Sequence, residues 1–142
     1  MFVFTMKAIL LTTILLVTTT LPILAQQAIE LTIVVKGFKS TAGTVKLQLV
    51  DADNKEMITH VSPLTSTTYT ITLNVYKAGK YAVNILHDKN NNNKLDTNIL
   101  GIPKEGWGCS NNARGVMSAP KFKDKLIDLS TNKTITINLV HY

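Results

Sequence analysis

Apolar and polar residues alternate with a period of two along much of this chain, and that pattern restricts the fold more than any other feature. Neighbouring side chains of a β-strand point to opposite faces of a sheet, so an alternating segment buries one face and exposes the other. The alternation predicts strands at 31–35, 45–49, 66–75, 81–87 and 134–142. Weaker patterns at 57–63 and 126–127 could add one or two more.

The fold class follows from these strands and from the lack of helical spacing. After residue 25 no long apolar run recurs at helical spacing, so no helices are available for the crossovers of a parallel α/β fold. Turn residues separate the strands at roughly the 8–12-residue spacing of β-sandwich proteins. The sequence therefore predicts an all-β fold: a single antiparallel β-sandwich, immunoglobulin-like or transthyretin-like, of about 6–7 strands.

Residues 1–25 have the features of a secretory signal peptide. Lys7 precedes an apolar run at 8–24, which has Pro22 near its end. The small residue Ala25 follows the run, and signal peptidase would cut there. An uncleaved membrane anchor is the alternative, because the run is nearly long enough to span a bilayer. Cleavage predicts an exported protein, periplasmic or extracellular, whose domain is residues 26–142 and which is not inserted in the membrane.

Charge and cysteine content exclude some functions. The formal net charge is +6, but the only dense basic cluster, at 121–125, is interrupted by Asp124. With few aromatic residues and no basic run, nucleic acid is not an expected partner. Cys109 is the only cysteine, so an internal disulfide is impossible. No neighbouring base would activate its thiol, and we expect a partly buried filler instead of a nucleophile.

The alternation is interrupted at 87–114 by a loop with the sequence HDKNNNNKLDTNILGIPKEGWGCSNNAR. Almost nothing in its first ten residues favours burial, so its order needs another source, and a bound hard cation is the best candidate. Alternate residues of a tight loop converge, as in calcium loops, where positions 1, 3, 5 and 9 supply side-chain oxygens and position 7 a carbonyl. Those positions are occupied here by Asp88, Asn90, Asn92, Asp96 and, at position 7, Lys94.

The loop also departs from the calcium template. Asn93 stands where glycine supplies a positive φ, and asparagine is the best substitute there. Ile99 replaces the bidentate glutamate of position 12, so we expect weak affinity, on the order of 10⁻⁴–10⁻³ M. Glu105 is a further candidate ligand. Oxygen ligands favour Ca²⁺ over zinc or copper, and the alternative is an Asn-rich turn that caps its own backbone without metal.

Three further residues of this loop, His87, Trp107 and Ser110, are of types that can catalyse a reaction or bind a ligand. Ser110, His87 and Asp88 could be imagined as a hydrolase triad, but adjacent strand residues point to opposite faces and no nucleophile elbow surrounds Ser110. We therefore predict no enzymatic activity and expect His87 to bond to a neighbouring loop. Trp107, the only tryptophan, either packs over the loop or forms a stacking platform for a sugar or peptide.

The loop resembles the signature of a family of exported bacterial proteins, domain of unknown function 2141, whose pattern runs HDxNxNGxLDxNxxGxPxEGxGFSN. Segments 79–83 and 119–122 also fit, so the resemblance covers nearly all of 26–142. In this chain Asn93 replaces the usual glycine and Cys109 the usual phenylalanine. The resemblance implies export and a small β-sandwich, and it brings no established activity. The matching residues of the loop are Asp88, Asn90, Asn92, Leu95, Asp96, Asn98, Gly101, Pro103, Glu105, Gly106, Gly108, Ser110 and Asn111.

The sequence thus predicts an exported, non-enzymatic β-sandwich module with a low-affinity Ca²⁺ loop. The segment 101–112 would face an unidentified protein, peptide or glycan partner. The alternative is a carbohydrate- or peptide-binding module that uses Trp107, with a metal-free structural loop.

Overall fold

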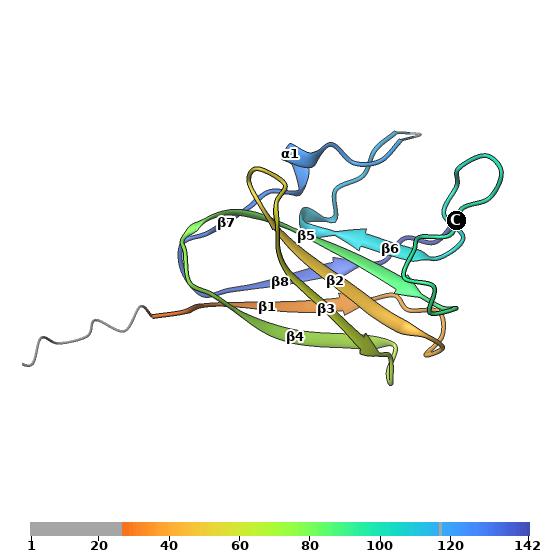
Figure 1. The fold of residues 1–142 in the computed structure, drawn as a ribbon, viewed down its shortest axis with the longest axis horizontal. Helices are drawn as coiled ribbons and strands as arrows, with labels where there is room; N and C mark the ends of the chain where they lie inside the picture. The colour runs from red at the N-terminus through yellow and green to blue at the C-terminus, as the bar shows by residue number, and fades with distance from the viewer. Residues whose placement is uncertain (1–26, 117) are drawn as a thin grey trace, which may run out of the picture.

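The computed structural model describes residues 27–116 and 118–142, so the expected signal peptide at 1–25 lies outside the described residues. In the described part of the chain, eight strands and two short helices follow one another (Figure 1). The strands are β1 (Ile29–Lys36), β2 (Thr44–Asp51), β3 (Glu56–Pro63), β4 (Thr68–Val75), β5 (Gly79–Asp88), β6 (Gly106–Cys109), β7 (Ile127–Leu129) and β8 (Lys133–Asn138). The helices are a 3₁₀ turn, η1 (Ser110–Asn112), and a single α-helical turn, α1 (Phe122–Lys125).

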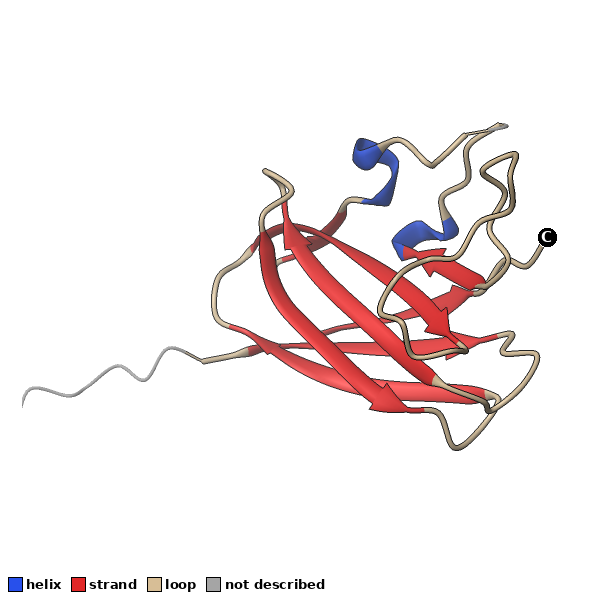
Figure 2. Ribbon diagram, turned by 45° about the vertical axis from the view of Figure 1, so that its right-hand side comes forward, coloured by secondary structure: helices blue, strands red, loops and turns tan. Residues whose placement is uncertain are grey.

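The strands form two sheets that pack face to face, which confirms the predicted all-β sandwich (Figures 1 and 2). One sheet has the order β4-β1-β8, and the other has the order β3-β2-β5-β6, with β7 pairing with the first residues of β5. All pairs within these sheets are antiparallel except β1 with β8, which run parallel. The first and last strands of the domain are therefore neighbours.

The core lies between the two sheets and is built by the alternating residues of their strands. Leu31, Ile33 and Val35 of β1 have no exposed surface, and the alternate residues of β2 and β5 meet them from the other sheet. Burial of these apolar side chains supplies the main driving force for folding. The residues of β2 and β5 that meet β1 in the core are Val45, Leu47, Leu49, Tyr81, Val83 and Ile85.

The ends and the short strands differ from the expectation. The strand predicted at 134–142 ends at Asn138, and the next residues leave the three-stranded sheet for the five-stranded one. The Leu139 N–H donates to the Lys36 carbonyl at 2.9 Å, whereas Val140 and Trp107 exchange backbone bonds of 2.7 and 3.1 Å. Residues 139–140 therefore join the two sheets along one side and cover the edge of β6.

Few of the described residues are helical. The α1 turn is capped by the backbone alone, with no side-chain hydrogen bond at its N-terminus. Among residues 27–116 and 118–142 there is no helix with the length and apolar character needed to cross a membrane.

Candidate functional site

Asp88 is the side chain around which the polar loop folds. It is the last residue of β5 and is completely buried. Its Oδ1 accepts the N–H of Asn92 at 3.1 Å, and its Oδ2 accepts the N–H of Asn93 at 2.6 Å. Because hydrogen bonds to an ionised acceptor are stronger than neutral ones, this carboxylate fixes the turn that follows it. The first predicted ligand is thus also a structural anchor.

The Asp96 carboxylate accepts hydrogen bonds from both predicted amide ligands, Asn90 and Asn92. The Nδ2 groups of Asn90 and Asn92 donate to the two oxygens of its carboxylate at 2.6 and 3.0 Å. The amide oxygens of the same asparagines accept backbone N–H groups, from Asn92 at 3.2 Å and from Lys94 at 2.8 Å. Three of the predicted ligand side chains are therefore in direct contact, and the fourth, Asp88, is bonded to their backbone.

The run of asparagines is explained by the backbone of this loop. Asn91 and Asn93 have φ values of 59° and 62°, in the left-handed region that most residues avoid. Asparagine tolerates this region better than other non-glycine residues because its short polar side chain bonds locally. The positive φ predicted at Asn93 is confirmed.

Glu105 closes the loop from its far end. Its side chain is 4% exposed, and its two carboxylate oxygens accept the N–H groups of Lys89 at 2.8 Å and of Asp96 at 3.1 Å. The Asp96 carbonyl in turn accepts the Lys104 N–H at 2.8 Å. The sequence suggested Glu105 as an additional metal ligand, and the structure places both of its oxygens on backbone donors. Sequence reasoning missed this bracing role, for which Glu105 at the loop's end was the only signal.

The chemistry of the loop fits a hard cation. Among the described residues, no three His, Cys, Asp or Glu side chains form a group able to hold a metal, so the ligand set would combine two carboxylates with neutral oxygens. The amide groups of Asn90 and Asn92 point their nitrogens at the Asp96 carboxylate. A half-turn of each amide would bring its oxygen there, and would give up the bonds that these oxygens accept from the N–H groups of Asn92 and Lys94. Carboxylate and amide oxygens are the donors that Ca²⁺ prefers.

A second turn, 98–102, follows the polar loop. The Asn98 side-chain oxygen accepts the N–H groups of Leu100 and Ile102 at 2.9 and 3.0 Å. Gly101 has a φ of 76°, which suits glycine. The turn leaves Ile99 fully exposed and Leu100 77% exposed. Two large apolar side chains are thus held in solvent by polar bonds beneath them.

His87 and Ser110 are both engaged in structural hydrogen bonds. His87 is completely buried, and its Nε2 lies 2.8 Å from the carbonyl of Ala42, to which it must donate. The expected bond from His87 to a neighbouring loop is confirmed. The Ser110 Oγ accepts the Val83 N–H at 3.0 Å and donates to the Lys125 carbonyl. Both side chains serve to join strands to loops.

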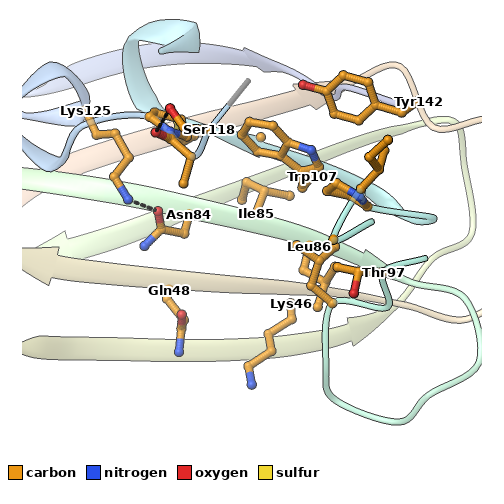
Figure 3. A pocket seen from close by; sticks show the side chains of 18 of the residues that line it. Lys46, Gln48, Asn84, Ile85, Leu86, Thr97, Trp107, Ser118, Lys125 and Tyr142 are labelled. Carbon is orange, nitrogen blue, oxygen red and sulfur yellow. Dashed lines mark hydrogen bonds between the residues drawn. The ribbon is translucent and has the colours of Figure 1, made fainter. Parts of the chain in front are cut away.

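Trp107 lines a groove of about 970 Å³ on the outer face of the five-stranded sheet (Figure 3). The ring is partly buried, with the Arg114 guanidinium 5.5 Å from its centroid. Its Nε1 has no hydrogen-bond partner among the described residues. The sequence identified Trp107 but not the groove, whose walls come from distant segments at 93–103 and 118–120 and from Tyr142.

Cys109 lies at the floor of the same groove and is 2% exposed. Burial raises the pKa of its thiol, and the nearby charges of Lys125 and Arg114 offset only part of this. A thiol reacts as its thiolate, so both the burial and the raised pKa slow its chemistry.

We expect Cys109 to resist alkylation by iodoacetamide at pH 8 in the native protein. The rate should be at least about tenfold lower than in urea, because only the opened chain exposes the thiol. Mass spectrometry of timed samples measures both rates. Native labelling as fast as in urea would show that the thiol is accessible and that the groove floor is open around it.

Comparisons with known proteins give a match to one protein family. The model of a family described as "Uncharacterized protein conserved in bacteria (DUF2141)" matches residues 33–138, which include every strand from β2 to β8 and the second half of β1. No curated protein and no solved structure gives a significant match.

Proposed function

We propose, from the premise that the chain belongs to the bacterial family DUF2141, that it is an exported, non-enzymatic β-sandwich module whose loop at 88–96 binds one Ca²⁺ ion. Export is inferred from the apolar segment at 8–24 that follows Lys7. The ligands would be side-chain oxygens of Asp88, Asn90, Asn92 and Asp96 and the carbonyl oxygen of Lys94.

The observation that carries the calcium proposal is the convergence of both asparagine amides on the Asp96 carboxylate. Without a metal, a carboxylate in a tight loop needs positive partial charge around it, and the two Nδ2 groups supply that charge. A divalent cation would supply more, and the amides would then turn their oxygens toward it, giving up the bonds that these oxygens accept from the N–H groups of Asn92 and Lys94. The oxygens of Asp88 and of Glu105 all accept backbone N–H groups, so either carboxylate would bind the ion only through lone pairs that remain, and the affinity stays low.

Calcium would act on the loop more than on the sandwich. The loop at 89–105 has few buried apolar residues and is held mainly by polar contacts. Segments of that kind open at low free-energy cost, and a ligand that binds only the folded form stabilises it by mass action. Bound Ca²⁺ would therefore hold the wall of the groove that contains Leu100 and Ile102.

The test is the melting temperature of the purified protein with Ca²⁺ or with a chelator. At Ca²⁺ concentrations about ten times the dissociation constant, the expected stabilisation is about 1.4 kcal/mol. For a domain of this size, that raises the melting temperature by about 5 °C. Differential scanning calorimetry at 10 mM CaCl₂ and in chelator measures the shift.

The control compares two isosteric substitutions. Asp96→Asn removes the charge of a proposed ligand while keeping its shape, and it should abolish the shift. Asp53→Asn makes the same change in an exposed turn, 51–55, and should leave the shift intact. An unresponsive parent protein, or an undiminished response in Asp96→Asn, would contradict calcium binding by this loop.

The second candidate function is a ligand-binding module centred on Trp107. A specific observation favours it: the only tryptophan lines a groove of about 970 Å³ instead of being covered by the loop. A volume of this order suits a small-molecule ligand. This function does not require the metal.

A further inference from the structure

The groove over the five-stranded sheet has a floor with two cross-strand rows. Lys46, Leu86 and Trp107 are paired partners on β2, β5 and β6, and they form the first row. Gln48, Asn84 and Cys109 form the second. Rows on one face are two residues apart, which is about 7 Å along the strands. Figure 3 shows Trp107 and Leu86 toward one end of the groove and Asn84 toward the other.

The end with Trp107 is apolar. Leu100 and Ile102, from the loop between β5 and β6, and Tyr142 also line the groove. In the view of Figure 3, Trp107 and Tyr142 are drawn on the same side of the groove. Leu100, Ile102 and Tyr142 remain 77%, 40% and 71% exposed. Large apolar side chains that converge while exposed to water mark a binding surface, because the removal of apolar surface from water lowers the free energy.

The other end is polar and basic. The Lys125 Nζ donates to the Asn84 Oδ1 at 2.9 Å, which holds the ammonium group over the sheet (Figure 3). Lys46, in the row of Leu86 and Trp107, also lines the groove, and none of the described lining residues has a carboxylate side chain. Glu56 on β3 accepts from Gln48 at 2.8 Å and lies outside the lining. The groove therefore combines an apolar surface with a net positive charge.

A sugar fits this lining poorly. Each hydroxyl group taken out of water needs a hydrogen-bond partner. The Gln48 amide nitrogen already donates to Glu56, and the Asn84 amide oxygen already accepts from Lys125. Some polar atoms of the lining remain without a partner, among them the Trp107 Nε1, but a sugar would have to satisfy several hydroxyl groups on them at once. A ligand with a hydrocarbon chain and one anionic group needs fewer polar contacts, and its charge complements the lysines.

We propose that this groove binds an amphipathic monocarboxylate, with its hydrocarbon chain on Leu86, Trp107 and Ile102 and its carboxylate at Lys125. The inference rests on the second candidate function, a binding site at Trp107, and is independent of calcium. The ammonium group of Lys125 is held in place before the ligand arrives, so less conformational freedom is lost on binding.

The experiment follows the fluorescence of Trp107, the only tryptophan in the chain, as the protein is titrated with dodecanoate below its micelle concentration. We expect a saturable change. Dodecanol, which has the same chain without the charge, should bind about fivefold more weakly, as one partly screened ion pair predicts. Longer saturated carboxylates should bind more tightly, by about fourfold for each added methylene group that the groove buries.

A matched pair of variants locates the carboxylate. Lys125→Gln removes the charge at the groove and should weaken dodecanoate about fivefold while leaving dodecanol unchanged. Lys123→Gln makes the same change on an exposed neighbour in α1 that does not line the groove, and it should behave as the parent does. The far-ultraviolet circular dichroism of each variant verifies that the sandwich is folded.

Three results would overturn the proposal: no saturable signal, equal affinity for dodecanol and dodecanoate, or undiminished dodecanoate binding by Lys125→Gln. A saturable response to cellobiose with none to dodecanoate would also overturn it in favour of a sugar site. The titration is run in chelator, because calcium salts of these carboxylates are sparingly soluble. Its failure would leave the calcium proposal intact, and a missing calcium shift would leave the titration valid.

Discussion

Gly43→Ala is expected to lower the free energy of unfolding by about 2–5 kcal/mol, a sum of backbone strain and overpacking. Gly43 has a φ of +81°, which a residue with a Cβ adopts only at a cost. A Cβ at this position would lie 2.1 Å from the Asp88 carbonyl oxygen and 2.6 Å from the Lys89 Cα. These are backbone atoms at the start of the polar loop, so relief of the clash would displace the loop itself. Urea unfolding followed by circular dichroism measures the loss.

Gly101→Ala is the matched control for the close approach. Gly101 has a similar φ of +76°, but a Cβ there would meet no atom within 4 Å. Only the conformational cost remains, about 1–2 kcal/mol. The difference between the two variants therefore isolates the contact between Gly43 and the Asp88–Lys89 backbone. Equal losses would mean that the approach at Gly43 carries no energetic weight.

Leu129→Ala should cost about 2–5 kcal/mol of unfolding free energy, because it removes a fully buried side chain and leaves a cavity. Leu129 belongs to the three-residue strand β7, whose partner is the first part of β5. A short strand has few backbone bonds, so we infer that its packing into the core holds it in place. Chemical denaturation and the melting temperature both report the loss.

The comparison for Leu129→Ala is the same substitution at Leu100, which is 77% exposed. Surface changes of this kind are usually within about 0.5 kcal/mol. Leu100→Ala should therefore leave stability nearly unchanged, although it shortens the apolar wall of the groove. A small loss in Leu129→Ala would indicate that β7 can detach from the sandwich without unfolding it.

The strands with one apolar face were predictable because their alternation is local. β2 and β5 bury the residues that the period of two selects. β6 was missed, because Gly106 and Gly108 occupy alternate positions and leave no pattern. Their lack of side chains is required by contacts distant in sequence: a Cβ on Gly106 would lie 2.5 Å from the His141 ring, and one on Gly108 2.7 Å from Ile137. The edge strand β3 gave a weak signal because it buries almost nothing.

The candidate site likewise has parts that the sequence predicts and parts that it does not. The local bonding of the asparagines could be predicted, since residue types and spacing determine which neighbours a short side chain reaches. The role of Glu105 could not, because its partners Lys89 and Asp96 are brought to it by the closed loop. The groove could not be predicted from the sequence, because its floor and walls are assembled from parts of the chain that lie far apart in sequence, from Lys46 to Tyr142.

The parallel pairing of β1 with β8 has a consequence for when this protein can fold. β1 is the central strand of its sheet, and the Glu30 N–H reaches the Asn132 side chain, 102 residues away, at 2.9 Å. Contacts so remote in sequence form slowly, because a long loop must close first. A chain still emerging from the ribosome acquires β8 after all the other strands, so β1 lacks its neighbour on that side until then. Such a delay would keep the three-stranded sheet incomplete until β8 has been made.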